Sequence, residues 1–169
     1  MRRATAVLGA AAVLWATAAS AQDKPNFSGK WQLDAEKTAA ANPQGTGRGG
    51  GGGGGGGRGG GMGTGPIAIT LTGADLAVER ETPQGAMTTT YKLDGSEQTV
   101  SMGQGDAKVK AKWEGATVVI ETTRMFNENS ITTKAVYSME GDYLVIATTS
   151  PGRGGGEPVT RKQYYKKGM

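Results

Sequence analysis

Arginine is the residue type in this sequence whose spacing most clearly suggests a binding site. Val118, Ile120, Thr122 and Arg124 share one parity of a strand-like run, and Val119, Glu121, Thr123 and Met125 share the other. Alternate residues of a strand point to opposite faces. If the first set faces inward, Arg124 is positioned to hold a carboxylate through two parallel hydrogen bonds. The alternative is that Arg124 leaves the strand at its solvated tip.

The last segment of the chain, 159–166, contains a second candidate set. In one strand register, three residues that could bind a carboxylate face inward, namely Arg161, Gln163 and Tyr165. The other register turns Lys162 and Tyr164 inward, because a slip of one residue exchanges the two faces. We favour the first register, since it puts Val159 inside and leaves the lysines in water.

Two further tyrosines, Tyr91 and Tyr137, lie on predicted strands and are candidates to line the same interior. Aromatic side chains dominate the packing of small cores. Together with Trp31, Trp113 and several methionines, these tyrosines could instead fill the interior completely.

The sequence contains no histidine and no cysteine. This excludes nucleophilic catalysis with a histidine base, and metal or haem binding by imidazole or thiolate. The acidic residues fall mainly at predicted turns, which accounts for their positions. The glycine-rich segment lacks the G-K-[ST] ending of a phosphate-binding loop. We therefore predict no catalytic residues, no metal site and no cofactor, and expect that the protein is not an enzyme.

Runs of alternating apolar and polar residues predict about ten short strands. We expect them near 28–33, 67–71, 76–78, 87–93, 100–102, 107–113, 118–126, 131–139, 143–149 and 159–165. The only predicted helix covers Asp34 to Ala41, with Asp34 as its cap and Asn42-Pro43 as its stop. Tight turns such as Asp94-Gly95 join the strands. This pattern predicts an all-β fold, either a sandwich or, as we favour, an antiparallel up-and-down β-barrel of about 8–10 strands.

The clearest alternation runs from Ala107 to Trp113, where Lys108, Lys110 and Lys112 occupy one face. We interpret this lysine face as the solvated side of a sheet. Binding of an anionic lipid or cell-wall polymer is the alternative.

Residues 1–21 have the three parts of an export signal. Arg2 and Arg3 precede an apolar stretch at 4–16, and Ala19-Ser20-Ala21 fits an A-x-A cleavage site. The stretch is shorter than the roughly 20 residues of a membrane-spanning helix. We predict an exported protein, periplasmic or secreted, with no integral membrane segment after cleavage. Removal of the two arginines lowers the formal net charge from +4 to about +2, which argues against a nucleic-acid partner.

Residues 22–169 are predicted to form a single domain, with a glycine-rich loop at 42–65 after the first strand. Glycine loses the most backbone entropy on ordering and has no side chain to bury. We therefore expect this loop to be solvated and disordered. Because the chain has no cysteine for a disulfide, the core alone must stabilise the domain.

The segment Phe27-Ser28-Gly29-Lys30-Trp31-Gln32-Leu33 resembles the first strand of the calycin barrels, the lipocalins and fatty-acid-binding proteins, which carries G-x-W. The short helix, the strand meander and the basic, aromatic last strand also resemble this family, in particular a bacterial secreted lipocalin-like domain. The glycine-rich loop is a departure from this family, since the loop occupies the place where the fatty-acid-binding proteins have a helical lid. The resemblance implies that Trp31 closes one end of the barrel beneath a basic residue of the last strand. We expect Gly29 to permit close backbone approach there.

These observations predict a barrel that binds a small apolar or fatty-acid-like ligand. The expected binding residues are Arg124, Arg161, Tyr165, Tyr91 and Tyr137, while Gly29 and Trp31 are structural. The alternative is a non-catalytic envelope or extracellular protein with a filled core and no small ligand. An empty interior pocket would favour the first, and a filled one the second.

Overall fold

The computed structural model describes residues 24–43, 65–82, 85–102, 105–126, 129–152 and 156–168. The predicted signal peptide, residues 1–21, lies outside these ranges, and so does most of the predicted loop at 42–65. Signal cleavage and disorder of the loop therefore stay predictions.

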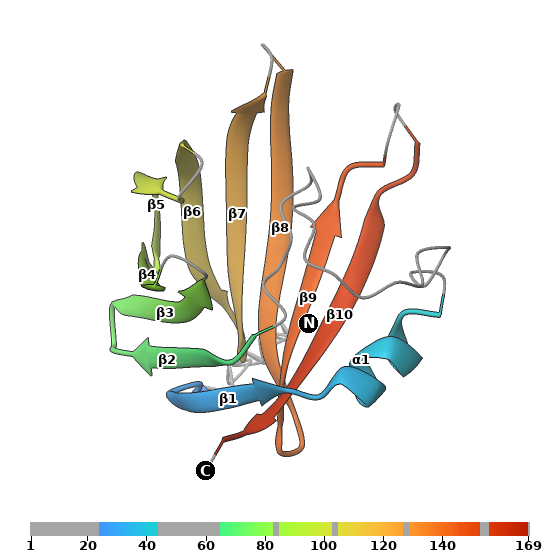
Figure 1. Ribbon diagram of the computed structural model, residues 1–169. Coiled ribbons are helices and arrows are strands. Elements are labelled where there is room, and N and C mark those ends of the chain that lie inside the picture. Colours follow the sequence, from blue (N-terminus) through green and yellow to red (C-terminus); the bar gives the residue numbers. More distant parts are fainter. Residues whose placement is uncertain are drawn as a thin grey trace, which may run out of the picture.

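Ten strands and one short helix form the described part of the chain (Figure 1). The strands are β1 (Gly29–Leu33), β2 (Ile67–Leu71), β3 (Asp75–Thr82), β4 (Gly85–Lys92), β5 (Asp94–Ser101), β6 (Asp106–Glu114), β7 (Thr117–Phe126), β8 (Asn129–Glu140), β9 (Tyr143–Ser150) and β10 (Val159–Lys167). The helix, α1 (Ala35–Ala41), follows β1. The predicted all-β fold with a short helix after the first strand is confirmed.

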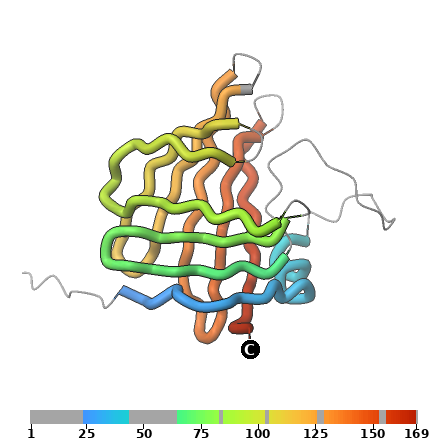
Figure 2. Tube along the Cα trace, turned by 60° about the vertical axis from the view of Figure 1, so that its left-hand side comes forward, coloured from blue at the N-terminus to red at the C-terminus, as the bar shows by residue number. Residues whose placement is uncertain are grey.

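All ten strands belong to one sheet with the order β4-β3-β2-β1-β10-β9-β8-β7-β6-β5. Strands that follow one another in the chain pair antiparallel, except β4 and β5, and β1 also pairs with β10, where Leu33 lies opposite Tyr165. β1 to β3 run crosswise to β7 to β10, so the sheet curls around one interior (Figures 1 and 2). The predicted up-and-down barrel is therefore confirmed. It is nearly closed, with one seam between β4 and β5, the two strands at the ends of the sheet order.

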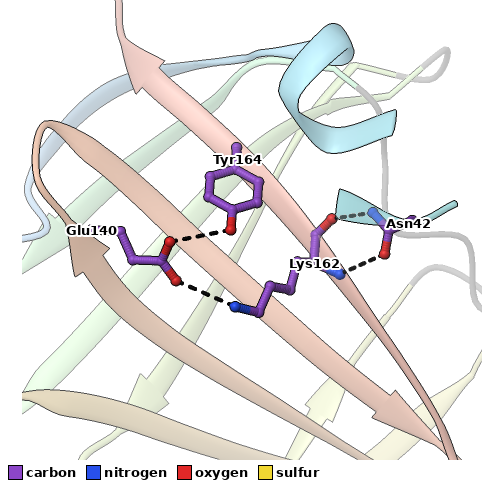
Figure 3. Close-up of polar contacts among 4 residues, drawn as sticks. All are labelled: Asn42, Glu140, Lys162 and Tyr164. Carbon is purple, nitrogen blue, oxygen red and sulfur yellow. Dashed lines mark hydrogen bonds and ion pairs between the residues drawn. The ribbon is translucent and has the colours of Figure 1, made fainter. Parts of the chain in front are cut away.

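Side-chain carboxamides bridge the barrel wall where strands do not pair. Gln98 of β5 accepts a hydrogen bond from the Lys92 backbone N–H and donates one to the Thr90 carbonyl of β4, both at 3.3 Å. Asn42 bonds β10 in the same way, with 3.0 Å to the Lys162 N–H and 2.7 Å to its carbonyl (Figure 3). A carboxamide offers the same donor and acceptor as a peptide group. Each of these carboxamide bridges, at Gln98 and Asn42, thus takes the place of a missing strand neighbour.

Helix α1 covers the edge of β10 through polar contacts. Its cap is Asp34, which accepts a hydrogen bond from the Lys37 backbone N–H at 3.0 Å. The Tyr164 N–H donates to the Thr38 hydroxyl at 2.9 Å, and no residue of α1 is buried. Nowhere in the described ranges is a helix long and apolar enough to cross a membrane.

The strand patterns separate the inside of the barrel from its outside. On β6 the side chains of Ala107, Val109 and Ala111 are buried, and the intervening lysines are exposed. The hairpin turns on either side of β7–β8 place Gly115 and Gly141 at φ near +60°, a region that glycine enters at little cost. Local alternation and turn residues therefore determine which side chains face the core.

One end of the interior is filled. We call it the packed end, formed by Phe27, Trp31, Trp113, Val118 and Leu144. The Phe27 and Trp113 rings stack with 5.6 Å between centroids, and the Trp31 indole N–H donates to the Phe27 carbonyl at 2.8 Å. The Lys167 ammonium of the last strand lies 6.0 Å from the centroid of the Trp31 ring. Gly29 has φ +140°, and a Cβ there would lie 3.5 Å from Cε of the Lys167 side chain.

Candidate functional site

Arg124 faces the interior, far from the packed end. Val118 and Ile120 belong to the core, so the parity that includes Arg124 is the inward one. Six residues along β7 separate Val118 from Arg124, a distance of about 20 Å at the rise of a strand. Arg124 is half-buried, and its Nη2 donates to the sulfur of Met102 at 2.7 Å. A thioether is a weak and uncharged acceptor, so this contact leaves the positive charge uncompensated.

Arg80 on β3 is a second inward-facing arginine, and the sequence analysis missed it. Leu76 and Val78 precede it on the same parity and are buried. The signal was present in the sequence, because the alternation of Leu76 and Val78 continues directly to Arg80. It was overlooked because the apolar run is short and charged residues flank Arg80 on both sides.

Three tyrosines surround Arg80, and all three are among the predicted ligand-binding residues. Tyr137 and Tyr165 are buried and Tyr91 is half-buried. Burial alone lowers the pKa of Arg80, but electrostatic interactions with Tyr137, Tyr165 and Tyr91 outweigh it and raise the pKa overall. Burial also raises the pKa of Tyr91 and of Tyr165. At neutral pH Arg80 is therefore a cation, and the hydroxyls of Tyr91 and Tyr165 are neutral.

Several polar atoms around this cluster are shielded from solvent and have no hydrogen-bond partner. They are Arg80 Nη1, the Tyr165 hydroxyl, Gln163 Oε1 and Thr148 Oγ1. These atoms come from β3 and from the last two strands, β9 and β10, so β3 is far from the other two in the sequence. Buried polar atoms are normally paired, and leaving them unpaired costs free energy. The cluster is therefore arranged to accept hydrogen bonds from, and donate them to, a polar group.

No carboxylate balances the two arginines from within the barrel. None of the Asp and Glu side chains in the described residues is buried. The ion pairs that the structure shows lie on the outer surface, for example between Lys112 and Glu114 at 2.8 Å. The described interior is therefore positively charged.

Arg80 and Arg124 face a common part of the interior, because Tyr91 lies within electrostatic range of both. Arg80 pairs with Met87 across β3 and β4, and Arg124 contacts Met102, which follows β5. We call the inward-facing, half-buried residues Arg80, Met87, Tyr91, Met102 and Arg124 the arginine end.

Arg161 is not enclosed with these groups. Gln163 and Tyr165 face inward, in the register that we favoured, but the Arg161 side chain is exposed. Its strand extends beyond β1, which pairs only with 165–167 of β10, so no neighbouring strand covers it on that side. The expectation that Arg161 and Val159 lie inside is therefore corrected, because β1 ends too early to cover them and both are exposed.

Tyr164 points outward from the same strand and is nevertheless buried, under α1. Its hydroxyl donates to Glu140 at 3.1 Å, and Lys162 contacts the other oxygen of that carboxylate at 3.4 Å (Figure 3). The Lys37 ammonium of α1 lies 5.1 Å from the centroid of the Tyr164 ring. These contacts attach the helix to the outside of the barrel wall and do not reach the interior.

The lysines on the outer face of β6 form ion pairs that are typical of a solvated surface. Lys108 and Lys110 approach Glu97 at 3.0 and 3.7 Å, and all three side chains are well exposed. Among the described residues, the hollows that the structure shows lie on this outer face, lined by residues such as Lys110 and Glu121. They are shallow and contain both signs of charge.

Comparisons with known proteins show the fold. No protein-family model matches the chain, and no curated protein matches it. A secretory abundant heat soluble protein from Ramazzottius varieornatus has a TM-score of 0.54 at 18% identity, over 88% of this chain and 100% of that one. The REP1-NXSQ fatty acid transporter has a TM-score of 0.53 at 13% identity, over 84% and 96%. Lipid binding protein 8 of Caenorhabditis elegans has a TM-score of 0.53 at 12% identity, over 84% and 95%.

These similarities and the ten-stranded up-and-down topology show that the chain has the fold of a calycin-type β-barrel. Structures of lipid-binding and fatty-acid-binding proteins have the same fold. At these identities the similarity extends to the fold and not to the residues of a site.

Proposed function

We propose that this protein is exported and binds a small amphiphile with an anionic group at the arginine end of its barrel. The observation that carries the proposal is the inward guanidinium of Arg80, whose Nη1 is shielded from solvent and unpaired. Similarity to a fatty acid transporter and to a lipid binding protein supports a ligand of this class.

The chemistry of the cluster selects an anion. An enclosed cation without a counter-ion is unfavourable, and an anion that accepts its hydrogen bonds removes that cost. A carboxylate can accept two parallel hydrogen bonds from a guanidinium, and the nearby Tyr165 hydroxyl is also unpaired. The thioethers of Met87 and Met102 supply apolar, adaptable contacts for a hydrocarbon chain.

Binding of parinaric acid, a fluorescent fatty acid, tests this proposal. Arg80→Gln should weaken parinaric acid binding about tenfold or more, because hydrogen bonds to charged groups contribute about 1.5 to 3 kcal/mol. Lys134→Gln, which removes an exposed charge from the outer wall, is the matched control and should bind like the wild type. The absence of binding by the wild type, or equal affinity of the wild type and Arg80→Gln, would refute the proposal.

A second candidate function is a structural or interaction role with no small ligand. The packed end favours it, because Phe27, Val118 and Leu144 have no exposed surface. The hollows at Lys110 and Glu121 also favour it, because they lie on the outer face and not inside the barrel. Native mass spectrometry of protein purified from its own host distinguishes the two. A mass equal to that of the chain alone, together with no binding of parinaric acid, supports the structural role.

Export is the part of the proposal that rests on residues 1–21 alone. The charged, apolar and small-residue regions occur in the order of a signal peptide. Fractionation of the source cells, with determination of the N-terminal residue, tests it. A mature chain that begins at Gln22 outside the cytoplasm is the expected result, and an uncleaved chain in the cytoplasm would contradict it.

A further inference from the structure

The two inward-facing arginines occupy different surroundings within the arginine end. Arg80 lies among the hydroxyls of Tyr137 and Tyr165. Arg124 lies near the end of β7, where its Nη2 contacts the sulfur of Met102, which follows β5. The first arginine is part of a polar cluster above the packed end, and the second is part of the rim. A single small anionic group therefore has two separate cations to choose between.

Neither cation is neutralised by the protein itself. No Asp or Glu of the described residues is buried, and the partners of Arg124 and Arg80 named above are neutral. One carboxylate at Arg80 would leave Arg124 with a thioether as its nearest acceptor. Enclosed charge is tolerated best when each ion has a counter-ion.

Apolar and aromatic side chains lie beside both arginines. Met87 of β4 pairs with Arg80 across β3 and β4, and Met102 contacts Arg124. Tyr91 is within electrostatic range of both arginines. Two thioethers and one phenol ring therefore lie near the two cations, and these groups suit an apolar connection.

Building on the proposed function, we propose that the ligand carries two anionic groups joined by an apolar segment. Arg80 and the tyrosine cluster hold one group, Arg124 at the rim holds the other, and the apolar segment lies along Met87 and Met102. The chemical class is that of an α,ω-dicarboxylate or a similarly doubly charged amphiphile.

Competition between matched acids tests this proposal. Octanoate, dodecanoate and hexadecanoate would each be compared with the dicarboxylate of the same length in displacing parinaric acid from the purified protein. We expect at least one dicarboxylate to bind about tenfold more tightly than its monocarboxylate, the increment that one charge-assisted hydrogen-bonded contact provides.

Variants at Arg124 and Met102 test whether the rim cation causes the preference for the dicarboxylate. Arg124→Gln should abolish the difference between the two acids of the best length by weakening the dicarboxylate more than the monocarboxylate, since the rim cation is lost. Arg124→Lys keeps the charge and should retain the preference for the dicarboxylate. Met102→Leu removes the thioether but not the charge, and should also retain it. Circular dichroism of each variant would verify that the barrel is folded.

The outcomes separate this inference from the function on which it rests. Equal affinity for both acids at every length overturns the two-anion ligand and leaves the proposed function standing. Weakening of both acids to the same extent by Arg124→Gln also overturns it, because both arginines then serve one anionic group. Failure of every acid to displace parinaric acid, or of parinaric acid to bind, refutes the proposed function itself.

Discussion

The packed end and the arginine end use the same ten-stranded wall for opposite purposes. At the packed end the ring of Phe27 stacks on that of Trp113, and the indole N–H of Trp31 finds a carbonyl. At the arginine end the inward side chains are half-exposed, and Arg80 Nη1 has no partner. The first end contributes to stability, whereas the second encloses a cation that has no counter-ion among the described residues. Such a division is expected where folding and binding place different demands on one interior.

Trp31→Ala should produce the largest effect and should act on stability. Removal of a buried tryptophan leaves a cavity and costs about 3 to 5 kcal/mol, and the Phe27 carbonyl loses its donor. Urea unfolding followed by circular dichroism measures this loss. Trp31→Phe keeps most of the ring volume and should cost less. A loss below 1 kcal/mol, which is about the scale of surface substitutions, would show that the packed end does not dominate stability.

Arg80→Leu should increase the free energy of unfolding and weaken the binding of parinaric acid. Replacing an enclosed, unpaired charge by an apolar side chain is often neutral or stabilising, and we expect a gain of about 1 kcal/mol in the free energy of unfolding. Parinaric acid binding should fall in the same variant. Paired urea and binding titrations measure both quantities. Strong destabilisation would mean that Arg80 has a structural role, and the contrast between the two ends would then fail.

Gln98→Ala tests the seam beside the arginine end. Its carboxamide makes two hydrogen bonds to β4, each at 3.3 Å. Their loss should cost about 1 kcal/mol, the net contribution of such bonds. Hydrogen exchange should report a faster rate for the Lys92 amide, while amides of β7 and β8 keep theirs. Unchanged exchange at Lys92 would show that the bridge does not protect the seam.

High pH should weaken the fold through the tyrosines. The folded-state pKa of Tyr91 and of Tyr165 is raised, chiefly by burial, above the unfolded value of about 10. A raised pKa stabilises the fold fully below the unfolded pKa, and this contribution is lost as pH rises through the folded pKa. The free energy of unfolding should therefore decrease above about pH 10.

Urea unfolding at several alkaline pH values, together with tyrosinate absorbance, measures this dependence. Tyr91→Phe and Tyr165→Phe should each reduce the slope. The prediction is wrong if both hydroxyls titrate in the folded protein as they do in the unfolded chain.

Lys110→Gln should have the smallest effect. The Lys110 ammonium lies 3.7 Å from Glu97, and both side chains are about half exposed, so water and salt screen the pair. The urea midpoint and the affinity for parinaric acid should both stay within experimental error of the wild type. A clear loss of binding would point to the outer lysine face as the anion site.

Local sequence patterns predicted most of the fold because they depend on neighbouring residues only. The alternation at 107–113 and the turn glycines defined strands and hairpins, and Asp34 marked the start of the helix. The prediction was weaker for the site. Three tyrosines of the expected set lie around one arginine, but that arginine is Arg80 and not Arg161.

What the sequence determined by itself was the period of each strand, the turn between each pair and the likeness of Gly29-Lys30-Trp31 to a calycin first strand. Only the tertiary structure decided which charges are enclosed. Alternation assigns a residue to a face, but burial depends on whether neighbouring strands extend far enough to cover it. β1 ends before it reaches Arg161, whereas barrel closure brings β3 against the tyrosines of β8 and β10 and encloses Arg80.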